Sequence, residues 1–258
     1  MATKALITGA TGLLGTQVVE NWNLPDIELV IAEHGSYDLL QPGVPMELFQ
    51  RFRPQVVIHL AWVASGTPNY RTSPDNEKWF DATRELERAC SSEGSWLIAT
   101  GTPLDEATPA KDGYSEAKTR LRRSFKAAIS SGAVTWLRPY YVIDLERQRP
   151  ALVAEALRAR SLMLPISLRS PESKHDFIIA SDVGRAIVEV VHHGMRGVVP
   201  IGSGELRKVS DLVSSLDASW ILGSDIGTLA EQSEEAADVE RLREVGWSPM
   251  KTDALFRH

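Results

Sequence analysis

Tyr114 and Lys118 lie four residues apart in the segment YSEAK and could act together in proton transfer. In a helix, residues four apart share a face, so both side chains can reach one reacting atom. A neighbouring ammonium favours the phenolate and brings the tyrosine pKa from about 10 toward neutral pH. Such a tyrosine can exchange a proton with a substrate oxygen. The spacing alone favours an exposed pair on a helix surface. The surrounding sequence must therefore decide between a surface pair and a catalytic pair.

The residues upstream of this pair offer a hydroxyl. The apolar run from Trp96 to Ala99 is typical of a buried strand, and Thr100 and Thr102 follow it. Open α/β sheets bind their ligands at the carboxyl ends of strands. A hydroxyl there can hydrogen-bond a substrate oxygen and stabilise developing charge, although turn or cap chemistry is the alternative for each threonine. Of the two, we expect Thr100 to be catalytic.

A glycine-rich run near the N-terminus indicates a dinucleotide site. Gly9, Gly12 and Gly15 follow the apolar stretch 5–7 and precede an amphipathic stretch. Glycines at this spacing allow a tight turn, a close approach of backbone to phosphate, and close packing of helix on strand. The N–H groups at the helix start then point at a pyrophosphate. Together with Tyr114 and Lys118, the run indicates hydride transfer to or from a nicotinamide. A phosphate-binding P-loop is excluded because no Gly-Lys-Ser/Thr follows.

Alternating strand-like and helix-like segments place these residues in an α/β fold. The predicted strands are 4–8, 27–32, 55–60, 95–100 and 133–137, and the predicted helices are 13–22, 45–52, 75–93 and 112–131. After residue 139 the elements become shorter, with a helix near 150–160, a strand at 176–180, a helix at 181–193 and a strand at 197–201. We predict a Rossmann-type doubly wound parallel sheet with a small C-terminal substrate-binding lobe. The expected division is a dinucleotide-binding core at 1–145 and a mixed segment at 146–258 that returns to the sheet.

Composition agrees with a cytoplasmic enzyme. The 258 residues are 43% hydrophobic and 24% charged, with a net charge of −6. There is no basic stripe, so nucleic acid is not an expected partner. No apolar run of about 18 residues is present, so no membrane span is expected. Cys90 is the single cysteine, which excludes an internal disulfide.

In their order along the chain, these motifs resemble the extended short-chain dehydrogenase/reductases, the NAD-dependent epimerase/dehydratase family that modifies nucleotide sugars. The resemblance covers nearly the whole chain. Beyond the glycine run, Thr100 and the Tyr114/Lys118 pair, it includes the segments HLAW (59–62), LRPYYV (137–142), HDFIIASDVGRAI (175–187) and GVVPIGSGE (197–205). It also includes the closing segment 241–249.

The resemblance implies roles for individual residues. Tyr114 would be the acid/base, and Lys118 would lower its pKa and hold the nicotinamide ribose. The other residues expected to bind the cofactor are Gly9, Thr11, Gly12, Leu13, Leu14, Gly15, Glu33, Asp38, Leu39, Leu60, Ala61, Trp62, Pro139 and Tyr140.

Glu33 bears on the choice of cofactor. An acidic side chain after the second strand can accept hydrogen bonds from both ribose hydroxyls and would repel a 2′-phosphate, which favours NAD. His34 could instead meet a phosphate, and the short link from Glu33 to Asp38 resembles the reductase branch of the family, so NADP stays open.

Departures from the family pattern concern the substrate. Only 14 positions separate Thr100 from Tyr114, and the segment 100–102 lacks the Asp-Glu pair of a sugar dehydratase, which argues against dehydration. Tyr141 stands where the family often has asparagine, and His175 where it has arginine. The expected substrate-binding residues are Thr102, Tyr141, Arg169, Lys174 and His175. For the last three, a solvated surface position is the equal alternative.

We therefore expect an NAD(P)-dependent oxidoreductase that reduces the 4-keto group of a nucleotide sugar. The alternatives are a nucleotide-sugar 4-epimerase that retains NAD, and a non-catalytic dinucleotide-binding or sensor protein. By resemblance, helices 75–93 and 112–131 would be the faces of a homodimer, and a monomer stays open because a chain of this size is stable on its own core.

Two further motifs have structural interpretations. His192-His193 precedes Gly194 at a predicted helix end, where cationic side chains act as caps. A metal site there would need further ligands, and we expect no metal at this position. Gly202-Ser203-Gly204 lacks the Gly-x-Ser-x-Gly frame of a hydrolase and is interpreted as a turn after a strand.

Overall fold

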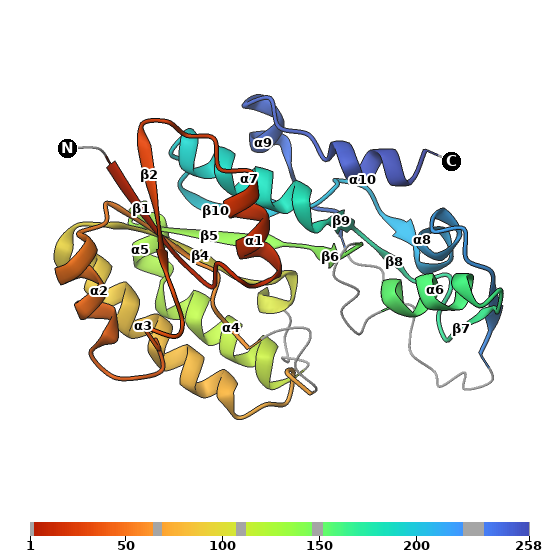
Figure 1. The fold of residues 1–258 in the computed structure, drawn as a ribbon, viewed down its shortest axis with the longest axis horizontal. Coiled ribbons are helices and arrows are strands. Elements are labelled where there is room, and N and C mark those ends of the chain that lie inside the picture. Colours follow the sequence, from red (N-terminus) through yellow and green to blue (C-terminus); the bar gives the residue numbers. More distant parts are fainter. Residues whose placement is uncertain (1–2, 64–68, 107–111, 146–151, 224–234, 258) are drawn as a thin grey trace. The chain divides into compact units, whose positions relative to one another are not determined.

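Six strands form the central sheet of the computed structural model, in the order β10-β5-β4-β3-β1-β2 (Figure 1). The structure describes residues 3–63, 69–106, 112–145, 152–223 and 235–257. Neighbouring strands from β2 to β5 are parallel. The strands are β1 (Thr3–Thr8), β2 (Ile27–Ala32), β3 (Val56–His59), β4 (Trp96–Thr100), β5 (Val134–Pro139) and β10 (Gly197–Ile201).

Helices cover both faces of this sheet, which confirms the predicted doubly wound α/β fold. On one side lie α2 (Val44–Phe52), α3 (Asp75–Glu93), α4 (Gly113–Ser124) and α5 (Lys126–Ser130), and on the other α1 (Leu13–Glu20) and α7 (Ala180–His192) (Figure 1). A Cβ on Gly184 of α7 would lie 2.6 Å from the backbone of Gln17, so α7 and α1 pack closely. Because both faces are covered, the central strands β3 and β4 are nearly continuous apolar runs.

The core under α2, α3 and α4 explains which strand residues are apolar. Leu6, Val57 and Leu97 are fully buried on neighbouring strands and pack in one cluster with Leu86 of α3 and Leu121 of α4. Side chains alternate between the two faces of a strand, so the intervening residues face the opposite layer. This packing supplies the rigid frame that holds the ends of the strands.

The strand order reverses between β1 and β3. From β1 the chain moves outward to β2 on one side, and it then returns to β3 on the other. Open α/β sheets bind ligands in the crevice at such a switch point, outside the carboxyl ends of the strands. The glycine turn after β1 and the segment 60–62 after β3 both lie at this edge.

The chain forms two compact units: residues 1–139 with 184–199, and residues 140–183 with 200–258. The described residues of the second unit form three short strand pairs: β6 (Tyr141–Ile143) with β9 (Phe177–Ile179), β7 (Ile166–Leu168) with β12 (Trp220–Leu222), and β8 (Lys174–His175) with β11 (Arg207–Lys208). Its helices include α6 (Leu152–Ser161), α8 (Val209–Ser215), α9 (Glu240–Glu244) and α10 (Met250–Leu255). The expected division at residue 145, and the substrate-binding role of the C-terminal part, stay predictions.

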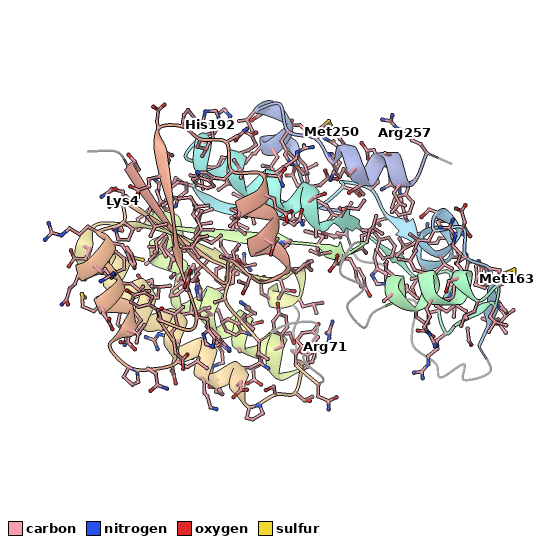
Figure 2. The ribbon with its side chains drawn as sticks, in the orientation of Figure 1. Lys4, Arg71, Met163, His192, Met250 and Arg257 are labelled. Atoms are coloured by element: carbon pink, nitrogen blue, oxygen red, sulfur yellow. The ribbon has the colours of Figure 1, made fainter. Side chains whose placement is uncertain are left out.

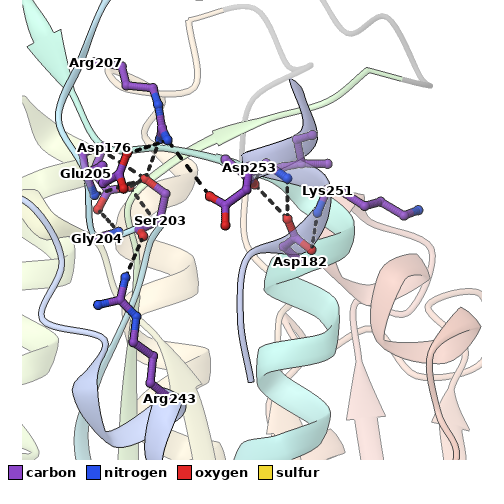
Figure 3. A network of polar contacts seen from close by, with 11 residues as sticks. Asp176, Asp182, Ser203, Gly204, Glu205, Arg207, Arg243, Lys251 and Asp253 are labelled. Carbon is purple, nitrogen blue, oxygen red and sulfur yellow. Dashed lines mark hydrogen bonds and ion pairs between the residues drawn. The ribbon is translucent and has the colours of Figure 1, made fainter. Parts of the chain in front are cut away.

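Two buried carboxylates organise the second unit (Figure 3). Asp176 accepts hydrogen bonds from the Ser203 N–H (2.6 Å), the Ser203 hydroxyl (2.7 Å) and the N–H groups of Gly204 and Ala237. Asp182 accepts from the N–H and hydroxyl of Thr252 at 2.8 and 2.7 Å. These bonds tie the segments 176–182, 203–204 and 237–252 together. The segment 202–204 is therefore a structural turn, as its sequence indicated.

Several predicted elements differ from the structure. The predicted helix 112–131 is two helices, because buried Phe125 leaves helical dihedral angles (φ −92°, ψ 4°) where its ring packs edge-on against Trp136. The predicted strand 176–180 ends at Ile179, and Ala180 begins α7. The strands β6, β7, β8, β11 and β12 were missed because runs of two or three residues carry no detectable periodicity.

We predict that Gly15→Ala destabilises the fold and Gly35→Ala does not. A Cβ on Gly15 would lie 2.0 Å from the carbonyl oxygen of Gly9, whereas a Cβ on Gly35 meets no atom within 4 Å. Relief of the clash requires the strand and helix to separate, at a cost of about 3 kcal/mol. Urea unfolding of both variants checks this, and equal unfolding free energies would show that the turn is not closely packed.

Candidate functional site

A buried histidine connects the strands at the candidate site. His59, the last residue of β3, is hydrogen-bonded to Thr8 at the end of β1 through Nδ1 (2.8 Å) and to Thr83 of α3 through Nε2 (2.9 Å). The Thr83 hydroxyl donates its own hydrogen to the carbonyl of Trp79 (2.7 Å), so it must accept from His59 Nε2–H. Nδ1 is therefore unprotonated and accepts from Thr8. Burial, aided by the charge of Lys118, lowers the pKa of His59 from 6.5 to about 3.

Backbone carbonyls continue this chain of contacts to the candidate catalytic lysine. The Thr100 hydroxyl, at the end of β4, donates to the carbonyl of His59 (3.1 Å). Lys118 Nζ, on α4, donates to the carbonyl of Thr100 (2.8 Å). We call the linked set Thr8, His59, Thr100 and Lys118 the carboxyl-edge relay. It joins β1, β3, β4 and α4 at the edge where ligands bind in this class of sheet.

The Lys118 ammonium is enclosed. Its residue is 4% exposed, and Nζ lies 3.5 Å from the centroid of the Trp62 ring. The indole is itself held by a hydrogen bond from its N–H to Asn76 (2.9 Å). A cation over an indole face is attracted by the ring quadrupole. Burial nonetheless lowers the pKa of Lys118 from 10.5 to about 7, with the carboxylate of Asp105 acting against it.

The start of α4 fixes the position of Tyr114. Asp112 caps the helix by accepting from the Ser115 N–H (2.7 Å), and Arg71 forms an ion pair with Asp112 (2.8 Å). The carbonyl of Arg71 also accepts from the Tyr114 N–H (2.9 Å). Although partial burial opposes the change, the Ser115 N–H and Arg71 lower the pKa of Asp112, so the capping carboxylate stays charged. The first turn of α4 is thus anchored on the segment 69–73.

Aromatic rings surround Tyr114. The ring of Tyr70 lies edge-on at 5.5 Å and that of Trp62 edge-on at 6.4 Å. Burial, together with Tyr70, raises the pKa of Tyr114 above its ordinary value. Lys118 Nζ lies 5.9 Å from the ring centroid and is bonded elsewhere. The prediction that the ammonium lowers the tyrosine pKa is therefore wrong for this structure, because the desolvation of the phenol outweighs the distant charge.

Sequence reasoning missed Asp105, which lies in the short 3₁₀ helix η1 (Pro103–Glu106). This carboxylate is 2% exposed and accepts from the Trp136 indole N–H (2.7 Å), with Arg138 and Arg122 at 3.4 and 3.6 Å. Burial is the largest influence on its pKa, which is raised despite these partners. The segment PLDE is typical of a polar surface turn, so no signal in the sequence predicts a buried acid.

The glycine turn fits a bound dinucleotide. Gly9 has φ +74°, and a Cβ there would lie 2.6 Å from the backbone nitrogen of Ala61. Gly12 precedes the first residue of α1, whose first turn carries no acidic side chain. Apart from its chain neighbours, the nearest atom to a Cβ on Gly12 is the Gly9 carbonyl oxygen at 3.1 Å, and no other atom of the described residues lies within 4 Å. The turn therefore leaves the helix start open to a phosphate and adds no negative charge to it.

Comparison with known proteins agrees with this geometry. The model of the NAD dependent epimerase/dehydratase family matches residues 5–202. The chain belongs to this family. None of the curated proteins compared with the chain matches it.

Solved structures of the same fold are distant in sequence. UDP-glucose 4-epimerase from Thermus thermophilus, in complex with NAD, is 20% identical with a TM-score of 0.73, over 96% of this chain and 94% of that chain. The dTDP-4-dehydrorhamnose reductase of Bacillus anthracis str. Ames, with NADP, is 16% identical with a TM-score of 0.78, over 100% of this chain and 97% of that chain. A GDP-L-fucose synthetase from Naegleria fowleri, with NADP, is 15% identical with a TM-score of 0.75, over 98% of this chain and 90% of that chain. At these identities the likeness shows the fold.

The structure brings most of the predicted cofactor residues to one edge. The Leu60 N–H donates to the carbonyl of Thr8 (3.1 Å), so segment 60–62 lies against the glycine turn. Glu33 is exposed just after β2, and its carbonyl accepts from the N–H groups of Ser36 and Tyr37. Asp38 uses one carboxylate oxygen to accept from the Leu40 N–H, which shapes the next turn. Thr11, Leu13 and Leu14 lie in the glycine turn and α1, and Leu39 is buried in the core. Their roles toward a cofactor stay predictions.

The predicted residues of the second unit form a separate group. The Tyr141 ring lies 5.1 Å from His175 and 5.1 Å from Phe177, and it is 42% exposed. Lys174 and Arg169 are exposed, and the Tyr140 N–H donates to the carbonyl of Ile201 (2.9 Å). These positions carry accessible aromatic and cationic groups, which is the chemistry a nucleotide ligand requires.

No helix among the described residues is long and apolar enough to cross a membrane. The predicted homodimer through α3 and α4 stays a prediction.

We predict that His59→Gln flattens the acid dependence of stability. The folded His59 resists protonation down to about pH 3, while the unfolded residue protonates near 6.5. The unfolded state therefore binds more protons in this window, and the wild type loses stability as pH falls through it. At pH 7 the variant should be about 1–3 kcal/mol less stable, because Thr8 and Thr83 lose a partner. Urea titrations at pH 7 and pH 5 test whether the difference narrows on acidification.

Lys118→Met should change the pH dependence of stability above pH 7. The unfolded lysine keeps its proton up to about 10.5, whereas the folded one releases it near 7. Wild-type stability therefore rises with pH between these values, and methionine removes that contribution. As the pH falls from 10 to 7, we expect the unfolding free energy of the variant to rise relative to that of the wild type. Parallel pH profiles of the two proteins would show that Lys118 is not desolvated in solution.

Proposed function

We propose that the protein is an NAD(P)-dependent oxidoreductase that reduces the 4-keto group of a nucleotide sugar. The observation that carries the proposal is the placement of Tyr114 and Lys118 on α4, with Lys118 Nζ bonded to the Thr100 carbonyl (2.8 Å) at the carboxyl edge of the sheet. Reduction of a ketone consumes a hydride and a proton, and a protonated phenol is a suitable general acid. Family membership and the glycine turn support the cofactor.

Residues of the first unit, together with Tyr140 at the start of the second, would hold the cofactor. The glycine turn and the start of α1 would bind the pyrophosphate, and Asp38 with Leu39 would border the adenine. The segment 60–62 would line the nicotinamide half, and Pro139 and Tyr140 would flank its carboxamide. When bound, the reduced nicotinamide supplies a hydride. Exposed Glu33 supports NAD, since a carboxylate there repels a 2′-phosphate, and His34 leaves NADP open.

The residues of α4 would manage the proton. Tyr114 donates it to the carbonyl oxygen of the substrate as that carbon becomes an alcohol carbon. Lys118 holds the nicotinamide ribose. Its ammonium form stabilises the phenolate that Tyr114 becomes when it gives up its proton. With a pKa of about 7, this lysine is itself able to donate a proton near neutral pH. These roles follow the family resemblance and agree with the placement of both residues on α4.

The two threonines differ in what their hydroxyls can still do. The Thr100 hydroxyl donates to the carbonyl of His59, so its hydrogen is committed to the carboxyl-edge relay. The Thr102 hydroxyl accepts from the Leu104 N–H (3.3 Å), which leaves its own hydrogen for another acceptor. This supports Thr102 over Thr100 as the donor to a substrate oxygen, contrary to our expectation from sequence. Tyr141, Arg169, Lys174 and His175 would contact the nucleotide.

We predict that the protein oxidises NADH or NADPH when supplied with a 4-keto nucleotide sugar. Reduced cofactor is followed by absorbance while the sugar product is followed by chromatography, and equal amounts should be consumed and formed. Interconversion of two nucleotide sugars without net loss of reduced cofactor would show an epimerase instead. Binding of the dinucleotide with no turnover of any sugar would indicate the non-catalytic alternative.

Tyr114→Phe should lower turnover by about a hundredfold or more while leaving dinucleotide binding intact, since it removes the acid and keeps the ring. The matched control is Tyr70→Phe, which removes a neighbouring phenol 5.5 Å away and should retain most activity. Equal losses in both variants would mean that the aromatic packing matters and the Tyr114 proton does not.

A further inference from the structure

A cluster of three potential metal ligands lies at the C-terminal end of α7, apart from the site described above. Glu189, His192 and His193 each place one ligand atom within 4.8 Å of the others. Their side chains are 33%, 59% and 37% exposed, so a solvated ion can reach them. Figure 2 labels His192 at this end of α7. The sequence pattern showed the two histidines and not the glutamate one turn earlier.

The distances within this cluster match a shared ion better than direct ion pairs. Glu189 Oε2 lies 3.7 Å from His192 Nδ1 and 3.3 Å from His193 Nε2. A charge-assisted hydrogen bond between these groups would be about 2.7–2.9 Å long. Ligand atoms bound about 2.1 Å from one tetrahedral ion lie about 3.4 Å apart. Both distances to Glu189 are close to this value, and all three ligand atoms lie within 4.8 Å of one another. The two imidazole rings also lie close, with centroids 4.5 Å apart.

The histidines are not needed to cap the helix, which is the role expected from the sequence. The carbonyls of the last turn accept backbone N–H groups: Glu189 from His193 (2.9 Å), Val190 from Met195 (3.0 Å) and Val191 from Gly194 (3.2 Å). Gly194 takes φ +60°, the left-handed conformation that allows this closure. Backbone N–H groups therefore bond these three carbonyls without help from the imidazoles, whose nitrogens are available to a ligand.

We propose that Glu189, His192 and His193 bind one divalent transition-metal ion, with Zn²⁺ as the best match and water at the open position. Two imidazoles and a carboxylate are a donor set that suits Zn²⁺, Ni²⁺ and Cu²⁺, whereas Mg²⁺ and Ca²⁺ prefer oxygen ligands. The negative end of the helix dipole adds to the attraction for a cation. The bound ion ties the last turn of α7 to the residue that follows it, just before β10.

Zn²⁺ titration of the metal-stripped full chain at pH 7.5 tests the proposal, with calorimetry and thermal unfolding as readouts. We expect one equivalent of Zn²⁺ to bind and the melting temperature to rise with Zn²⁺ concentration by mass action. Mg²⁺ at the same concentrations should produce no shift. Because the readouts are binding and unfolding, the result is independent of the oxidoreductase activity proposed above.

Matched variants identify the ligands. Glu189→Gln, His192→Gln and His193→Gln should each weaken Zn²⁺ binding by at least about tenfold, a loss of about 1.4 kcal/mol. His34→Gln removes an exposed histidine elsewhere and should leave Zn²⁺ binding unchanged. Unfolding in the presence of a chelator shows whether each variant is folded. Wild-type binding no tighter than that of the double variant His192→Gln/His193→Gln, or an equal loss in His34→Gln, would overturn the proposal.

Discussion

The neutral imidazole of His59 is the constraint on which the candidate site depends. Its ring joins β1 to α3 through Thr8 and Thr83, and its carbonyl receives the Thr100 hydroxyl. In the neutral ring, Nε2–H donates to Thr83 and Nδ1 accepts from Thr8. Burial keeps the ring neutral by lowering its pKa. The strand ends are thereby held in register, and the Thr100 carbonyl is fixed where Lys118 can donate to it.

Desolvation dominates the electrostatics of the Tyr114/Lys118 pair. An ammonium close to a phenol would favour the phenolate, but Lys118 donates to a backbone carbonyl and faces the Trp62 indole. Both groups are consequently biased toward their neutral forms, the phenol protonated and the amine partly deprotonated. The Tyr114 phenol therefore carries the proton that a general acid donates. This is the protonation state that reduction of a carbonyl requires.

The sequence predicted those parts of the fold and site that the backbone determines. Continuous apolar runs revealed the central strands, because a sheet covered on both faces leaves no polar alternation. The glycine run was recognisable because Gly9 and Gly15 have no room for a Cβ. Features set by tertiary contacts could not be predicted: the helix break at Phe125 depends on Trp136, and buried Asp105 depends on the same indole.

The same distinction applies to the two histidine motifs. His59 was noted only as part of a family segment, because its two threonine partners are 51 and 24 residues away in the chain. His192 and His193 were interpreted as caps, because a sequence shows the helix end but not which donors reach its carbonyls. Backbone N–H groups reach those carbonyls, and the proposal that the rings bind a metal depends on Glu189 one turn earlier as a third ligand. In both cases the chemistry of the imidazole follows from what its neighbours have already bonded.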